Sequence, residues 1–166
     1  EATIDAAPGS VIHMTGSTFA NRSADPASAG GLANVSMVFE GGAGVIDSYE
    51  AAGEDRGARL EGFEDNFTMG ALAIGGSDDG NVILDDNIDN TASADPEAVY
   101  LGEMIVNAGS VLDLNGLNVY VLEWPTLDGV VNESGGYWWH VVGLGDFNGD
   151  GALNGLDIPG FKAALE

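Results

Sequence analysis

Short apolar runs separated by turn-forming residues constrain the fold of this chain more than any other feature. Up to residue 142 each run is only a few residues long, and clusters of Gly, Asn, Asp and Ser separate the runs. Between residues 111 and 122 apolar residues recur at alternate positions, which is the period of a half-buried strand. The sequence predicts an all-β region with strands at 10–14, 35–39, 66–74, 81–84, 98–101, 104–107, 111–114, 117–122 and 137–142. Before residue 156, only residues 53–62 suggest a helical turn.

Two segments one hundred residues apart share a pattern. Residues 9–19 and 109–119 both read Gly-Ser-Val, then apolar, polar, apolar, and then Thr or Asn before Gly. Repeated strand–turn units stack as rungs in a β-solenoid, so we expect a parallel β-helix-like solenoid first. Convergent strand–turn chemistry explains the pattern equally well, and no steady repeat is visible. A β-sandwich is therefore the second expectation.

Residues 146–157 form the pattern D-F-N-G-D-G-A-L-N-G-L-D, with oxygen-bearing side chains at loop positions 1, 3, 5, 9 and 12. Calcium takes six to eight oxygen ligands, and a loop that wraps it reverses sharply at its centre, where Gly151 stands. Chance gives roughly 0.01 such matches in a chain of this composition. The predicted Ca²⁺ ligands are Asp146, Asn148, Asp150, the carbonyl of Ala152, Asn154 and Asp157.

The residues that flank this loop indicate a family. Ile158, Phe161 and Leu165 recur at helical spacing after the loop, whereas residues 137–142 before it are β-rich. A calcium loop with an exiting helix and no entering helix resembles a dockerin repeat, which is an EF-hand-type unit. The resemblance implies calcium binding at 146–157 and a cohesin-like partner, although dockerins carry two repeats and this chain carries one. We expect a β domain over 1–142 and a dockerin-like tail over 143–166.

The β region also resembles a known group of modules. Segments 39–42, 45–55, 97–101 and 109–120 are similar to the C-terminal β modules of large secreted planctomycete surface proteins. Such modules often precede a dockerin-like tail. The resemblance implies a structural role at the cell surface and brings no catalytic residues with it.

Composition excludes several classes of partner. Lys and Arg total 4 against 27 Asp and Glu, for a net charge of −23. A surface of this charge repels nucleic acid and anionic membranes. The chain has no cysteine, and it has no apolar stretch near the roughly 18 residues that a membrane span needs. Calcium is abundant outside cells, so we expect a secreted protein, either a whole mature chain or a fragment.

A second acidic cluster at residues 85–90 repeats the D-x-N-x-D opening of a calcium loop. Asp78 and Asp79 lie nearby in the sequence. Position 12 of this loop is Pro96, which has no ligating side chain, and Glu97 comes one residue late. The sequence therefore leaves a second calcium site and a solvated turn as open alternatives.

The aromatic and histidine residues form no recognisable catalytic motif. Trp138 and Trp139 are adjacent, and adjacent strand residues point to opposite faces, so they cannot form one flat sugar-binding surface. His13 and His140 are the only histidines, and neither stands in a known nucleophile, metalloprotease or phosphate-binding motif. We expect a protein that is not an enzyme.

The unpaired calcium repeat suggests self-association. Loops of this type usually pair through the apolar residue at position 8, here Leu153. The apolar face of the short terminal helix also needs covering. We expect a calcium-binding, non-catalytic structural protein of the cell exterior that self-associates with calcium, in a filament if the contact is head-to-tail. The alternative is a glycan-binding or glycan-active module with a dockerin-like tail.

Overall fold

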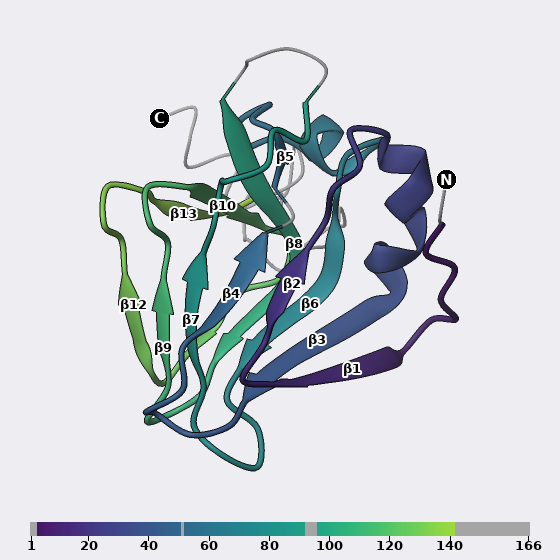
Figure 1. The fold of residues 1–166 in the computed structure, drawn as a ribbon. Helices are drawn as coiled ribbons and strands as arrows, with labels where there is room; N and C mark the ends of the chain where they lie inside the picture. The colour runs from purple at the N-terminus through teal and green to yellow at the C-terminus, as the bar shows by residue number, and fades with distance from the viewer. Residues whose placement is uncertain (1–2, 51, 92–95, 142–166) are drawn as a thin grey trace, which may run out of the picture.

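The computed structural model describes residues 3–50, 52–91 and 96–141. Within these ranges β-strand is the main regular structure, at 42% of residues against 10% helix, and the strands form one eight-stranded and one five-stranded sheet. All strand pairings are parallel except that between β5 and β8. The all-β prediction is confirmed (Figure 1).

The larger sheet has the strand order β1-β3-β6-β8-β10-β13, and β5 and β11 also pair with β8. Its strands are β1 (Ser10–Thr15), β3 (Val35–Glu40), β5 (Gly53–Glu54), β6 (Met69–Ile74), β8 (Glu97–Val106), β10 (Asn118–Val121), β11 (Thr126–Leu127) and β13 (Trp138–His140).

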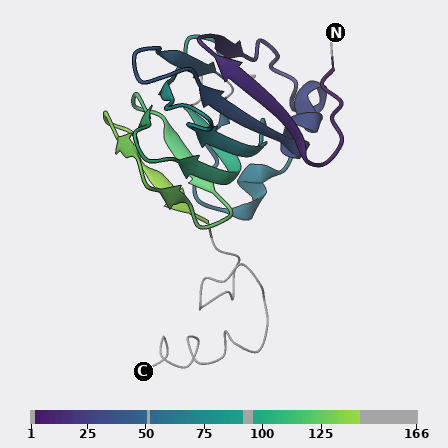
Figure 2. The ribbon, with the colours of Figure 1, turned by 90° about the horizontal axis from the view of Figure 1, so that it is seen from below.

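The smaller sheet has the order β12-β9-β7-β4-β2. Its strands are β2 (Thr18–Ala20), β4 (Asp47–Glu50), β7 (Asn81–Leu84), β9 (Val111–Asp113) and β12 (Val130–Asn132). The chain passes repeatedly from a strand of the larger sheet to a strand of the smaller one, as from β1 to β2, β3 to β4 and β6 to β7. It advances at the same time from one end of the sheets to the other, which the colour gradient of Figure 2 makes visible.

The core lies between the two sheets and is built by alternation along the strands. In β3, Val35, Met37 and Phe39 are buried while the residues between them are half-buried. The parallel register places apolar side chains of neighbouring strands side by side. Met37 pairs with Leu72, and Leu72 pairs with Met104. Each of these three side chains is 0% exposed, and such burial stabilises the fold by about 1.5–3 kcal/mol per side chain. These side chains form a continuous apolar row across β3, β6 and β8.

The similar segments 9–19 and 109–119 share turn chemistry. Gly9 and Gly109 have φ of 79° and 85°, and the amides of Ser10 and Ser110 each donate to a carbonyl three residues earlier. β1, however, belongs to the larger sheet and β9 to the smaller one. The two segments are therefore not equivalent rungs of one sheet, and the shared sequence reflects the turn that begins each strand.

Several predicted boundaries need correction. The segments 98–101 and 104–107 belong to one strand, β8, and the strands β2, β4, β5, β11 and β12 were not predicted. A nine-residue 3-10 helix, η1 (Pro26–Asn34), was also missed; Asp25 caps it by accepting from the Ala27 amide at 3.1 Å. The predicted helical turn within 53–62 is in part a strand, β5, followed by a 3-10 turn, η2 (Leu60–Phe63).

The predicted boundary at residue 142, the calcium loop at 146–157 and the helix after it lie outside the described residues. Within the described ranges, no helix has both the length and the apolar character needed to cross a membrane.

Candidate metal centre

The six ligands predicted for the terminal loop, Asp146, Asn148, Asp150, Ala152, Asn154 and Asp157, are all outside the described residues. The described part of the chain contains a different acidic cluster, which includes one residue of the second predicted loop. In this cluster a carboxylate oxygen from each of Glu50, Asp86 and Glu97 lies within 4.8 Å of the others. We call these three residues the acidic triad.

Parallel pairing brings the triad together. Glu50 is the last residue of β4, and β4 pairs with β7 so that Tyr49 lies opposite Leu84. Asp86 follows the end of β7 by two residues, so it lies at the same edge of the sheet as Glu50. Glu97 is the first residue of β8, in the other sheet.

Glu50 is held in a defined orientation. Its side chain is almost fully buried, at 2% exposure, and Oε2 accepts a hydrogen bond from the Asn87 amide at 2.6 Å. Oε1 is buried and has no hydrogen-bond partner. A buried acceptor without a partner costs about 1–3 kcal/mol, and more if it is charged.

Glu97 repeats this arrangement. It is 8% exposed, and Oε1 accepts from the amides of Asn90 and Thr91 at 2.5 and 3.1 Å. Oε2 is buried without a hydrogen-bond partner. Two buried glutamates of the triad therefore each have one oxygen fixed by backbone amides and a second oxygen unused.

The electrostatics of the site disfavour three free carboxylates. Burial, helped by the charges of Asp86 and Asp89 and opposed by the Asn90 amide, raises the pKa of Glu97 to about 7. Burial likewise raises the pKa of Glu50, together with the charges of Asp86 and Asp85. The two ion pairs of the described residues, His13–Glu40 and Arg56–Glu54, do not involve the triad. Either protons or a cation must therefore offset this negative charge.

A third buried oxygen without a hydrogen-bond partner belongs to Asn90, in the loop after β7 that also carries Asp86. Asn90 is 2% exposed, and its Nδ2 donates to the carbonyls of Asn21 and Ser23 at 3.1 and 3.0 Å. Its Oδ1 is buried and has no hydrogen-bond partner. Carboxylate and amide oxygens are ligands that suit hard divalent cations such as calcium, magnesium or manganese. The arrangement can hold such an ion between β4, the loop after β7 and the start of β8.

The sequence indicated the loop but not the residues that converge. Its D-x-N-x-D pattern pointed to Asp85, Asn87 and Asp89, whereas the triad uses Asp86. Asp89 instead accepts from the Thr91 amide and hydroxyl at 3.0 and 2.9 Å, which closes a local turn. Glu50 was missed because it comes from a strand with no apolar run. For Glu97 the sequence offered one signal, which is that it comes one residue after loop position 12, occupied by Pro96.

The prediction that Trp138 and Trp139 point to opposite faces of their strand is confirmed. Trp138 packs against the main core, whereas Trp139 is 39% exposed and stacks on Tyr120 at 5.3 Å. The residues that share a face are Tyr137 and Trp139, whose ring centroids are 5.7 Å apart.

The two histidines make separate contacts. The Nδ1 atom of His13 lies 3.0 Å from Glu40, and the Nε2 atom of His140 lies 3.0 Å from the carbonyl of Leu122. Each contact fixes the orientation of one imidazole ring against a neighbouring segment of the chain.

Comparison of the chain with protein-family models, with curated proteins and with solved structures finds no match.

Proposed function

We propose that this chain is a non-catalytic, calcium-binding structural protein of the cell exterior, which self-associates at the cell surface or in a filament or matrix. The observation that supports it best is the acidic triad. Buried glutamates that carry unused oxygens beside a third carboxylate are costly in the absence of a cation. A bound divalent ion would remove that cost and connect three segments of the chain.

Calcium is the ion that we favour. Its coordination is flexible, it takes up to eight oxygens, and it does not require the near-ideal octahedron that magnesium demands. The triad combines two fixed glutamates with an exposed aspartate on a loop, which suits a variable geometry. Millimolar calcium outside cells would fill even a weak site, and a chain with a net charge of −23 attracts cations.

For the fold we propose a parallel β-solenoid rather than a β-sandwich. The parallel pairing of every strand pair except β5 with β8, and the alternation of the chain between the two sheets, support this choice. Sandwich sheets are typically antiparallel and need hairpins or Greek-key connections. In such a solenoid an ion at the triad would join neighbouring turns of the coil at one corner.

The terminal loop would supply a second calcium site. Together with the planctomycete-type resemblance of the β region, it supports a C-terminal surface module that ends in one dockerin-like repeat. The sequence predicts one such repeat, and a second copy of this chain or a cohesin-like partner would cover its Leu153 and the apolar face of its predicted helix. Because like-charged copies repel each other, calcium would act as the bridge.

Thermal unfolding with calcium and with chelator tests the role of the triad. The measurement uses the full chain in an Asp146→Ala background, so that the terminal loop does not contribute. Calcium at about one hundred times its dissociation constant should add about 2.7 kcal/mol, which corresponds to roughly 5–10 °C in a domain of this size. Glu50→Gln should abolish that rise and should also raise the melting temperature in chelator, because it removes like-charge repulsion.

Asp47→Asn is the matched control. Asp47 is also 2% exposed and also has one buried oxygen without a partner, but it is not part of the triad. Its variant should keep the full calcium-dependent rise. Equal rises in the Glu50→Gln and Asp47→Asn variants would contradict the proposal.

A further inference from the structure

Three aromatic rings form a column on the side of the larger sheet that faces away from the main core. Tyr100, Tyr120 and Trp139 occupy matched positions on β8, β10 and β13, because Tyr120 pairs in register with both of its neighbours. The ring centroids are 4.9 and 5.3 Å apart, and the planes differ by only 29° and 17°. Phe63 packs edge-on against Tyr100 at 5.0 Å and ends the column.

The column becomes exposed toward β13. Tyr100 is 1% and Tyr120 4% exposed, whereas Trp139 is 39% exposed and Tyr137, on the same face of the strand, is 54% exposed. β13 is the last strand on its path through the sheet. Stacking on a buried column holds the Trp139 ring in one orientation, so its exposed surface is pre-organised.

A polar cavity adjoins the column at Tyr120. It has a volume of about 640 Å³ and is lined by the 54–61 segment together with Tyr120. This cavity is shallow and largely open to solvent, so it suits part of an extended polymer better than a fully enclosed small molecule. Asp55 links the cavity to the column, since its Oδ1 accepts from the Tyr120 hydroxyl at 2.9 Å and its Oδ2 accepts from Asn118 at 3.0 Å.

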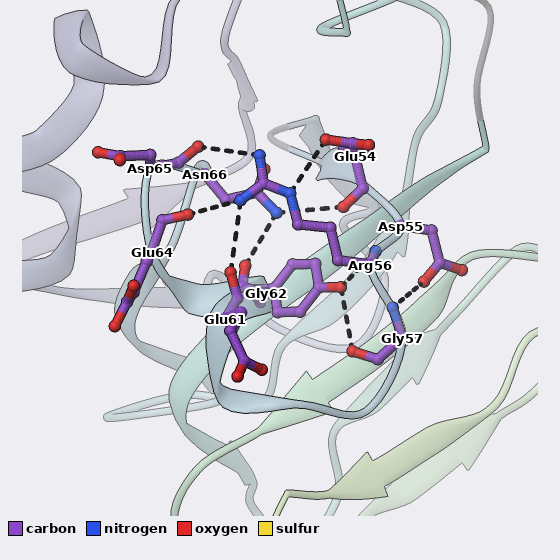
Figure 3. Close-up of polar contacts among 10 residues, drawn as sticks. Glu54, Asp55, Arg56, Gly57, Glu61, Gly62, Glu64, Asp65 and Asn66 are labelled. Carbon is purple, nitrogen blue, oxygen red and sulfur yellow. Dashed lines mark hydrogen bonds and ion pairs between the residues drawn. The ribbon is translucent and has the colours of Figure 1, made fainter.

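The loop that lines the cavity is held in place by Arg56. Its guanidinium pairs with Glu54 at 3.0 Å and donates to the carbonyls of Glu61, Glu64 and Asp65 (Figure 3). The Tyr100 hydroxyl accepts from the Arg56 amide at 2.8 Å, which fixes the loop to the aromatic column. Figure 3 shows the Asp55 carboxylate on the opposite side of the loop from the guanidinium.

Arg59 completes the polar lining. Its side chain is exposed at the cavity and makes neither of the two ion pairs of the described residues. Arg56 and Arg59 are two of only four basic residues in a chain with a net charge of −23. Carboxylates and guanidinium donors therefore lie together in this cavity, beside aromatic rings.

We propose that Trp139, Tyr137 and this cavity form a binding site for a neutral polysaccharide. A pyranose ring offers an apolar C–H face to an aromatic ring, while its hydroxyls donate to carboxylates and accept from guanidinium groups. Asp55 and Arg59 supply those two kinds of partner. A neutral polymer fits because the overall charge repels polyanions. The site is separate from the acidic triad, and the inference does not depend on calcium binding.

Affinity electrophoresis of the full chain through gels that contain soluble neutral polysaccharides tests this site. The panel is a β-glucan, a galactomannan, a xyloglucan and a xylan, with alginate as a polyanion, all in calcium-containing buffer. At least one neutral polymer should retard the wild-type chain. Trp139→Ala should weaken binding about tenfold, which corresponds to about 1.4 kcal/mol, and Arg59→Ala should weaken it too. Trp139→Phe should keep most of the binding, because it retains a stacking ring.

Trp124→Ala is the matched control, because Trp124 is 71% exposed but packs edge-on against His140 instead of joining the column. This variant should bind like wild type. Retardation by alginate alone, no retardation by any neutral polymer, or equal losses in the Trp124→Ala and Trp139→Ala variants would overturn the proposal. Arg59 lies on an exposed loop, so its variant tests the site even if Trp139→Ala fails to fold.

Discussion

Replacing Glu97 with glutamine should change how the stability of the calcium-free protein depends on pH. Burial raises the pKa of this carboxyl from 4.5 to about 7 in the folded chain. Between these values the unfolded chain has released the proton while the folded chain still holds it. The folded state therefore binds more protons, and its stability falls as pH rises through this window.

The size of the effect follows from the pKa difference. A change from 4.5 to about 7 corresponds to at most about 3 kcal/mol. This is a large share of the roughly 5–15 kcal/mol that stabilises a typical domain. Glutamine cannot ionise, but its amide oxygen can still accept from the Asn90 and Thr91 amides. The variant should therefore lose the part of the pH dependence that Glu97 contributes and keep the local hydrogen bonds.

Urea unfolding in chelator between about pH 5 and pH 8 measures this effect. The wild-type chain should lose up to about 3 kcal/mol more than the Glu97→Gln variant across that range. Parallel slopes for wild type and Glu97→Gln would refute the reasoning, because they would mean that Glu97 ionises as freely in the folded chain as in the unfolded one.

Two further predictions concern the charge of Glu40 and the oligomeric state of the chain. The Ser77 amide and His13 hold the pKa of Glu40 below its ordinary value of 4.5, so the stability that Glu40 contributes is present above that pH and lost as pH falls through the lowered pKa. Glu40→Gln should therefore destabilise the chain near neutral pH but not in acid, and urea unfolding at both pH values checks this. Light scattering should detect oligomers in calcium and monomers in chelator; monomers in both at high protein concentration would exclude calcium-dependent self-association.

The strands that the sequence predicted are those whose apolar residues alternate or form a run. Residues 81–84 were predicted with the bounds of β7, and β3 was predicted to within one residue. β4 was missed because its sequence is Asp-Ser-Tyr-Glu, and both acids are 2% exposed. Charged residues usually mark solvent, so no rule of periodicity would assign these four residues to a buried strand.

The candidate site could be predicted only in part for a related reason. The loop after β7 carries a local pattern of oxygen-bearing side chains, and such a pattern is visible in the sequence. Glu50 and Glu97 join Asp86 only through the parallel pairing of β4 with β7 and the position of β8, which are contacts distant in sequence. The same holds for Tyr100, Tyr120 and Trp139, which become one column only through the register of three strands.

Counting the calcium ions that each chain binds tests the central claim most directly. Equilibrium dialysis or titration calorimetry of the full chain should find two sites. Asp146→Ala should remove one of them and leave the other. Glu50→Gln combined with Glu97→Gln should remove the second, and Asp47→Asn should remove neither. Binding that stays unchanged when both glutamates of the triad are replaced, or a wild-type chain that binds no calcium, would contradict the account.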